Sequence, residues 1–214
     1  MCWETAYEQW LNAPALSQQE QEELRAIQKD KMELRERFYA PLAFGTAGLR
    51  GTMKVGLHHM NVHVVRWVTQ GFAEVICAES DWAGDRKAAV CMDGRKNSRR
   101  FAEAAAEVLA ANGITVYLFD GPRPTPELSF AVRAYGCLAG INITASHNPK
   151  EYNGYKAYWC DGAQLQTETA MAVSARLEEI DVFAGPKRMD LQRGIELGRI
   201  CLLGRSCDEA YLKA

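Results

Sequence analysis

The chain has 214 residues, of which 48% are hydrophobic and 24% are charged, and its formal net charge is −2. This composition predicts a folded chain with a sizeable core, and the small net charge gives no electrostatic case for binding nucleic acid or acidic membranes. We find no signal-peptide pattern and no apolar run long enough to span a bilayer. The seven cysteines are scattered without C-x-x-C spacing, which favours reduced thiols and a cytoplasmic location.

The first 40 residues are expected to form a helical segment. Ser17 and Glu20 have capping-box spacing and predict one charged helix that runs to about Tyr39, where Pro41 ends it. Residues 41–186 are predicted to form the main domain, beginning with a strand at 49–55 and a helix at 61–78 that Asn61 caps.

Strands and helices then alternate along the chain. Further strands are predicted at 87–92, 114–119, 138–143 and 155–159, and helices at 98–112, 125–135 and 167–180, the last with Thr167 as its cap. This alternation indicates an α/β layer structure. Residues 184–193 have the composition of a linker. Residues 187–214 are therefore predicted to be a linker and the truncated start of a second domain that docks loosely, frays or associates with another copy.

The most informative stretch runs from Thr144 to Tyr158, TASHNPKEYNGYKAY. It follows the apolar run LAGINI and contains two turn-forming pairs, Asn148-Pro149 and Asn153-Gly154. Ser146 is therefore predicted to lie on an exposed loop at the end of a strand, where reactive groups are often carried. An ordinary surface turn is an equally good interpretation of the local pattern.

The residue types around Ser146 narrow its chemistry. The G-x-S-x-G elbow of a serine hydrolase is missing, and the adjacent His147 is poorly placed to take the serine's proton. Donor groups from His147 and Asn148, together with the Lys156 ammonium, instead suit a dianion such as a phosphoryl group. Phosphoryl transfer depends mainly on positioning and charge stabilisation, which such a cluster can supply. A kinase is disfavoured because no P-loop is present.

Four segments together resemble one family, the α-D-phosphohexomutases of the phosphoglucomutase and phosphomannomutase superfamily. These are FGTAGLRG at 44–51, MDGRKNSRRFAEAAAEVL at 92–109, RPTPELSFAVR at 123–133 and TASHNPKEYNGYKAYW at 144–159. The chain is most similar to the branch that includes phosphoglucomutase/phosphopentomutase enzymes. The resemblance implies a three-layer α/β/α domain I with a mixed sheet of about four strands.

The same resemblance implies a phosphosugar mutase that moves a phosphoryl group between the 1- and 6-positions, or the 1- and 5-positions of a pentose. Ser146 would carry the group and pass it to a sugar phosphate, through a bisphosphorylated sugar. Mg²⁺ would bind partly through a phosphoryl oxygen on Ser146. The residues implied as catalytic are Ser146, His147, Lys156 and Arg50. Those implied to bind substrate or phosphate are Thr46, Gly48, Arg50, Asn148 and Arg95, although a salt bridge at a helix start is an equal alternative for Arg95.

The chain is short for this family, whose enzymes are four-domain proteins more than twice as long. No D-x-D-x-D metal loop is found, and hard cations need several oxygen ligands. We therefore expect an N-terminal portion that is inactive alone and needs the C-terminal domains of the same protein. The alternative is a non-catalytic sugar-phosphate-binding module or a truncated relic.

One departure from the family pattern concerns the histidines. His59 stands where this branch often has an arginine, which weakens any phosphate contact from that position. His59 and His63 are spaced i, i+4, but with no acidic or cysteine partner nearby in the sequence, a metal site is disfavoured.

Overall fold

The computed structural model describes residues 2–214 and contains one six-stranded sheet with the order β1-β5-β4-β2-β3-β6. Strand β5 pairs antiparallel with both β1 and β4, whereas β4, β2, β3 and β6 run parallel. The strand bounds are β1 Leu49–Thr52, β2 Lys87–Met92, β3 Thr115–Phe119, β4 Ala139–Ile143, β5 Tyr152–Trp159 and β6 Ile200–Leu203.

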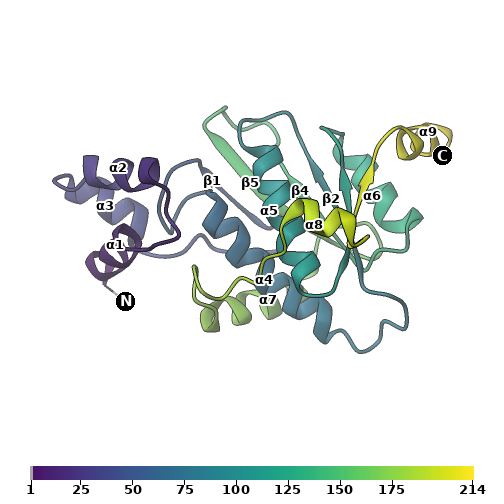
Figure 1. The fold of residues 1–214 in the computed structure, drawn as a ribbon, viewed down its shortest axis with the longest axis horizontal. Coiled ribbons are helices and arrows are strands. Elements are labelled where there is room, and N and C mark those ends of the chain that lie inside the picture. Colours follow the sequence, from purple (N-terminus) through teal and green to yellow (C-terminus); the bar gives the residue numbers. More distant parts are fainter. Residues whose placement is uncertain (1) are drawn as a thin grey trace.

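Helices cover both faces of this sheet (Figure 1). One face packs against α4 (Val62–Ala78), α5 (Ser98–Ala111) and α7 (Thr167–Glu179), which contribute many residues of the larger apolar core. The other face packs against α6 (Thr125–Ala134), and a cysteine of α9 (Arg205–Lys213) belongs to the same apolar cluster. The predicted α/β/α fold class is confirmed. Along the described residues, none of these helices is both long and apolar enough to cross a membrane.

The C-terminal segment is part of the sheet, and the loose docking expected for it is wrong. Ile200–Leu203 pair in parallel with Val116–Phe119, and the Arg123 guanidinium binds the Asp208 carboxylate of α9 at 2.6 Å. The short helix α8 (Leu191–Glu196) precedes this strand. With β1 at one edge and β6 at the other, the sheet has six strands instead of about four. The start of a second domain within 187–214 stays a prediction.

The N-terminal helices lie at the opposite end of the molecule from α9 (Figure 1). They are α1 (Trp3–Leu11), α2 (Gln18–Ala26) and α3 (Lys31–Phe38). The capping box of Ser17 and Glu20 is confirmed, but the single long helix predicted after it is wrong. The chain breaks at 27–30 because the Asp30 carboxylate accepts hydrogen bonds from the backbone N–H groups of Met32 and Glu33, which starts a new helix.

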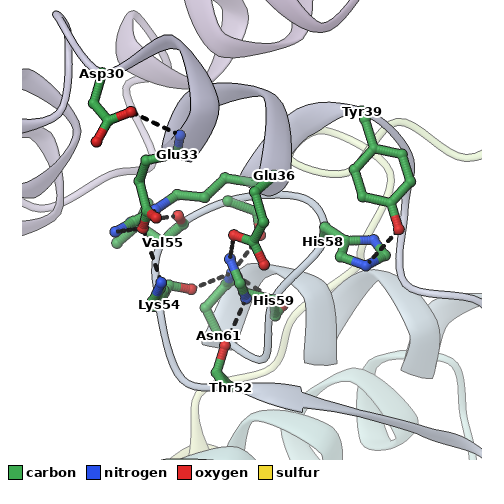
Figure 2. Close-up of polar contacts among 12 residues, drawn as sticks. Asp30, Glu33, Glu36, Tyr39, Thr52, Lys54, Val55, His58, His59 and Asn61 are labelled. Carbon is green, nitrogen blue, oxygen red and sulfur yellow. Dashed lines mark hydrogen bonds and ion pairs between the residues drawn. The ribbon is translucent and has the colours of Figure 1, made fainter.

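A polar network attaches α3 to the chain that follows β1 (Figure 2). His59 lies between the Glu36 carboxylate and the Thr52 hydroxyl, at 2.8 and 2.9 Å. Lys54 binds Glu33 at 2.8 Å beside it. Only 2% of His59 is exposed, and this burial lowers its pKa below the ordinary value although Glu36 acts in the opposite direction. The strand predicted to reach Val55 therefore ends at Thr52, where this network begins.

The turn predicted at Asn153-Gly154 is also wrong, because both residues lie inside β5. Arg50 pairs with Gly154, and Gly51 pairs with Asn153. A Cβ at Gly154 would stand 2.6 Å from the Thr144 carbonyl oxygen, so the glycine permits close approach of neighbouring backbone rather than a turn. Helix α7 likewise begins without the predicted Thr167 cap, since its N-cap residue is Gln166.

Candidate functional site

The loop of residues 144–151 joins β4 to β5 and carries Ser146 at an exposed position. Ser146 has a φ of 56°, in the left-handed region that non-glycine residues rarely occupy. Its backbone N–H donates to the Thr144 hydroxyl at 3.0 Å, which helps to hold this conformation. Strain of this kind persists only where the surroundings enforce it, and it often marks a functional position.

Arg95, in the loop after β2, is the main support of the serine loop. Its terminal nitrogens donate to four backbone carbonyl oxygens, those of Ser146 (2.8 Å), Asn148 (2.7 Å), Pro149 (2.8 Å) and Tyr152 (3.2 Å). Its Nε forms an ion pair with Asp93 at 3.2 Å. Four of the five N–H donors of the guanidinium are thus occupied by carbonyl oxygens, and the fifth faces Asp93. Arg95 therefore shapes the loop, and the phosphate contact predicted for it stays a prediction.

A cavity of about 460 Å³ lies beside this loop and brings together all four residues predicted as catalytic. Ser146, His147, Arg50 and Lys156 all line it, with Gly48 from the N-terminal motif. The FGTAGLRG motif and the serine loop are about a hundred residues apart in the chain. They meet because β1 pairs with β5, which sets Arg50 opposite Gly154. Arg50 also donates to the Asn148 side-chain oxygen at 2.8 Å.

Gly48 lets the N-terminal motif approach β5 closely. Its φ is +78°, and a Cβ there would stand 1.8 Å from the Tyr155 carbonyl oxygen. Gly45 and Gly48 exchange two backbone hydrogen bonds, of 3.0 and 2.7 Å, and so form a tight turn. Thr46 is exposed within this turn and does not line the cavity.

The cavity suits an anion. Its lining includes the Arg50 guanidinium, the Lys156 ammonium and the His147 ring, but no carboxylate among the described residues. The Ser146 hydroxyl oxygen is 3.4 Å from His147 Nδ1. A phosphoryl group on this hydroxyl would lie among positive charges and hydrogen-bond donors. The same lining does not fit Mg²⁺ by itself, because a hard cation prefers several oxygen ligands.

A second cavity of about 900 Å³ adjoins the other side of the serine loop. Asn148 and Arg95 line it, as do the ammonium-bearing Lys54, Lys96 and Lys150. Sequence reasoning missed both this cavity and the role of Arg95 in the loop. Only the position of Arg95 just after a predicted strand hinted at that role.

The histidines outside the site have carboxylate neighbours that sequence spacing did not reveal. His59 contacts Glu36 at 2.8 Å, and His63 lies 3.3 Å from Glu20. Both carboxylates come from the N-terminal helices, far away in sequence. Across residues 2–214 no group of three or more potential ligands is arranged to hold a metal ion.

Comparison with known proteins places this chain in one family. The model for "Phosphoglucomutase/phosphomannomutase, alpha/beta/alpha domain I" matches residues 41–183. A phosphoglucomutase from Staphylococcus aureus (strain USA300) is 44% identical over 153 residues, which are 72% of this chain and 27% of that protein. The chain thus spans about a quarter of the length of this relative.

Solved structures agree with this match. A protein from Thermus thermophilus, assigned as a phosphomannomutase, has a TM-score of 0.59 and 33% identity, over 72% of this chain and 34% of its own. The open form of parafusin, a Paramecium phosphoglucomutase, has a TM-score of 0.54 at 23% identity, over 66% of this chain and 27% of its own, and supports the fold alone. The chain therefore belongs to the phosphoglucomutase/phosphomannomutase family, and residues 41–183 are its α/β/α domain I.

Proposed function

We propose that this chain is the phosphoryl-carrying portion of a phosphosugar mutase, with Ser146 as the carrier. The observation that supports this most is the shared cavity of Ser146, Arg50 and Lys156, in which one hydroxyl lies among positively charged side chains. The strained backbone of Ser146 and the support from Arg95 present that hydroxyl in a defined position. Phosphoryl transfer gains most from such positioning and charge stabilisation.

In the proposed reaction, the hydroxyl oxygen of a sugar phosphate attacks the phosphorus on Ser146. The bond between phosphorus and Ser146 Oγ breaks as the new bond forms, and the sugar becomes bisphosphorylated. The proton of the attacking hydroxyl replaces the phosphoryl group on Ser146 Oγ, and His147 or the Lys156 ammonium is the candidate carrier that gives one proton to Oγ and receives one from the sugar. After the sugar reorients, its other phosphoryl group returns to Ser146. Arg50 and Lys156 offset the charge on the transferring group.

The substrate class proposed is a hexose or pentose phosphate, exchanged between the 1- and 6- or the 1- and 5-positions. Mg²⁺ would use a phosphoryl oxygen on Ser146 and would need further oxygen ligands that the described cavity lining does not provide. We therefore propose that residues beyond this chain complete the metal site, and that the chain alone can accept a single phosphoryl group but does not complete a turnover. A cytoplasmic location suits this chemistry.

The test is phosphoryl transfer to the chain itself. Incubation with glucose 1,6-bisphosphate and Mg²⁺, followed by intact-mass measurement and site mapping, should add one phosphoryl group at Ser146. Ser146→Ala should abolish the addition, whereas Ser80→Ala, at an exposed serine remote in sequence, should leave it unchanged. Labelling at another residue would contradict the proposal. Binding of the bisphosphate without transfer would favour the alternative, a non-catalytic sugar-phosphate-binding module.

A further inference from the structure

Asn142, near the end of β4, is a polar residue in an otherwise apolar strand. Only 1% of it is exposed, and its neighbours Ile141 and Ile143 belong to the main core. Its side-chain nitrogen donates to the Thr125 hydroxyl at 2.9 Å, at the start of α6. Its side-chain oxygen is buried and has no hydrogen-bond partner in the described structure. A buried acceptor without a partner costs about 1–3 kcal/mol, so it calls for an explanation.

The pairing of β4 with β5 sets Asn142 directly opposite Lys156. Residues opposite each other in an antiparallel pair point to the same face, with Cβ atoms about 5 Å apart. Arg50 lies opposite Gly154, two positions along β5 from Lys156, and so belongs to the same face. The lysine that lines the Ser146 cavity is thus the cross-strand neighbour of an unsatisfied amide oxygen.

Lys156 is equally short of partners. Throughout residues 2–214, no hydrogen bond or ion pair holds its ammonium group. An ammonium has three N–H donors, so it can give one to an amide oxygen and still present two to a phosphoryl group. A flexible lysine side chain loses considerable rotamer freedom when its ammonium group is held in one place. A hydrogen bond to the Asn142 oxygen would hold the ammonium group before the reaction, so less freedom would be lost during the reaction.

We propose that Asn142 is a positioning residue for Lys156. Its side-chain oxygen accepts a hydrogen bond from the Lys156 ammonium and directs the remaining donors toward the phosphoryl group on Ser146. Thr125 orients the amide, because the bond from the amide nitrogen to its hydroxyl leaves the oxygen free for the lysine. The catalytic consequence of this inference rests on the proposed function, but the contact between Asn142 and Lys156 can be tested without any substrate.

The first experiment measures the contact directly. In protein labelled with ¹⁵N-lysine, NMR should detect slow exchange of the Lys156 ammonium protons with water, the signal being assigned by its loss in Lys156→Arg. Asn142→Leu should accelerate that exchange several-fold, because the acceptor is gone. Cys91→Ala is the matched packing control. Cys91 lies in β2 opposite Asn142 of β4, is equally buried and belongs to the apolar cluster on the α6 face. Unchanged exchange in Asn142→Leu would overturn the inference.

The second experiment separates positioning from stability. Asn142→Leu replaces a buried amide with an apolar side chain of similar size, so its thermal unfolding temperature should change little. The rate of phosphoryl transfer from glucose 1,6-bisphosphate to Ser146 should nevertheless fall about tenfold, the loss expected for one hydrogen bond to a charged group. Asn142→Gln, which keeps an amide, should recover part of the rate.

A transfer rate for Asn142→Leu equal to that of the unmodified chain would contradict the positioning role. Should the unmodified chain accept no phosphoryl group at all, the proposed function fails. The ammonium-exchange result would still decide the contact between Asn142 and Lys156.

Discussion

Two residues with left-handed backbone conformations shape the proposed phosphoryl site. Ser146 has a φ of 56° and presents its hydroxyl to the cavity, while Gly48, at +78°, brings the N-terminal motif against β5. The two positions differ in whether a side chain can be accommodated there. A serine can adopt this conformation at some cost in strain, but at Gly48 no Cβ fits beside the Tyr155 carbonyl group.

Gly48→Ala is therefore predicted to destabilise the chain by about 3 kcal/mol or more, because steric overlap adds to the strain of the left-handed conformation. Gly113→Ala is the matched control, with a φ of +81° but no atom near the added Cβ. It should lose only about 1 kcal/mol. Chemical denaturation measures both values. Equal losses for the two variants would show that the contact with Tyr155 is not the reason for Gly48.

At the scale of elements, α3 is joined to the segment after β1 by polar contacts in addition to the shared apolar core. Arg37 is 5% exposed and donates to Glu23, to Glu33 and to the Val55 carbonyl oxygen, at 2.5, 3.0 and 2.9 Å. One guanidinium thus links α2, α3 and the chain leaving β1. Figure 2 shows part of this network around Val55 and Lys54.

Arg37→Ala should lower the free energy of unfolding by about 2 kcal/mol, because the Val55 carbonyl group and two carboxylates lose a shared donor. The two glutamates are partly exposed, which keeps the loss below that of a fully buried pair. Hydrogen exchange should quicken mainly in residues 3–38. Arg35→Ala, on the exposed side of the same helix, should change little. A similar effect in both variants would refute the role given to Arg37.

At the scale of the whole molecule, one cluster of charges joins the C-terminal helix to the sheet domain. Arg123 binds Asp208 of α9 and Asp120, and Glu127 lies 4.0 Å away. Three carboxylates therefore surround one guanidinium. Glu127 is 3% exposed, and its burial, followed by its hydrogen bond with Asp208, raises its pKa to about 7.

This raised pKa predicts a pH dependence of stability. The unfolded side chain titrates near 4.5 and the folded one near 7, so between these values the folded state binds more protons and stability falls as pH rises. Glu127→Gln should remove this dependence and stabilise the chain at pH 8 by on the order of 2 kcal/mol. Denaturation at pH 5 and pH 8 is the measurement. The exposed Glu168→Gln serves as control, and an unchanged pH profile in Glu127→Gln would contradict the prediction.

Much of the architecture followed from local pattern. The run KAAVCM predicted β2 with its observed bounds, and the Asn61 cap predicted α4, because apolar periodicity and capping are read from neighbouring residues. The serine loop was recognisable because its residue types sit together in the chain. Ser146 and Lys156 accordingly needed no tertiary information to be chosen as candidates.

The remaining features of the fold and the site depend on contacts between residues that are far apart in the sequence. Asn153-Gly154 has the composition of a turn, yet pairing with β1 draws it into a strand, and residues 200–203 become a sixth strand only because the edge of β3 is available. Four donors of Arg95 meet carbonyl groups more than fifty residues away, and the cross-strand register alone sets Asn142 against Lys156. A sequence pattern records the preference of each residue for burial and backbone conformation. Which groups then meet depends on strand register and chain crossing, which are properties of the tertiary structure.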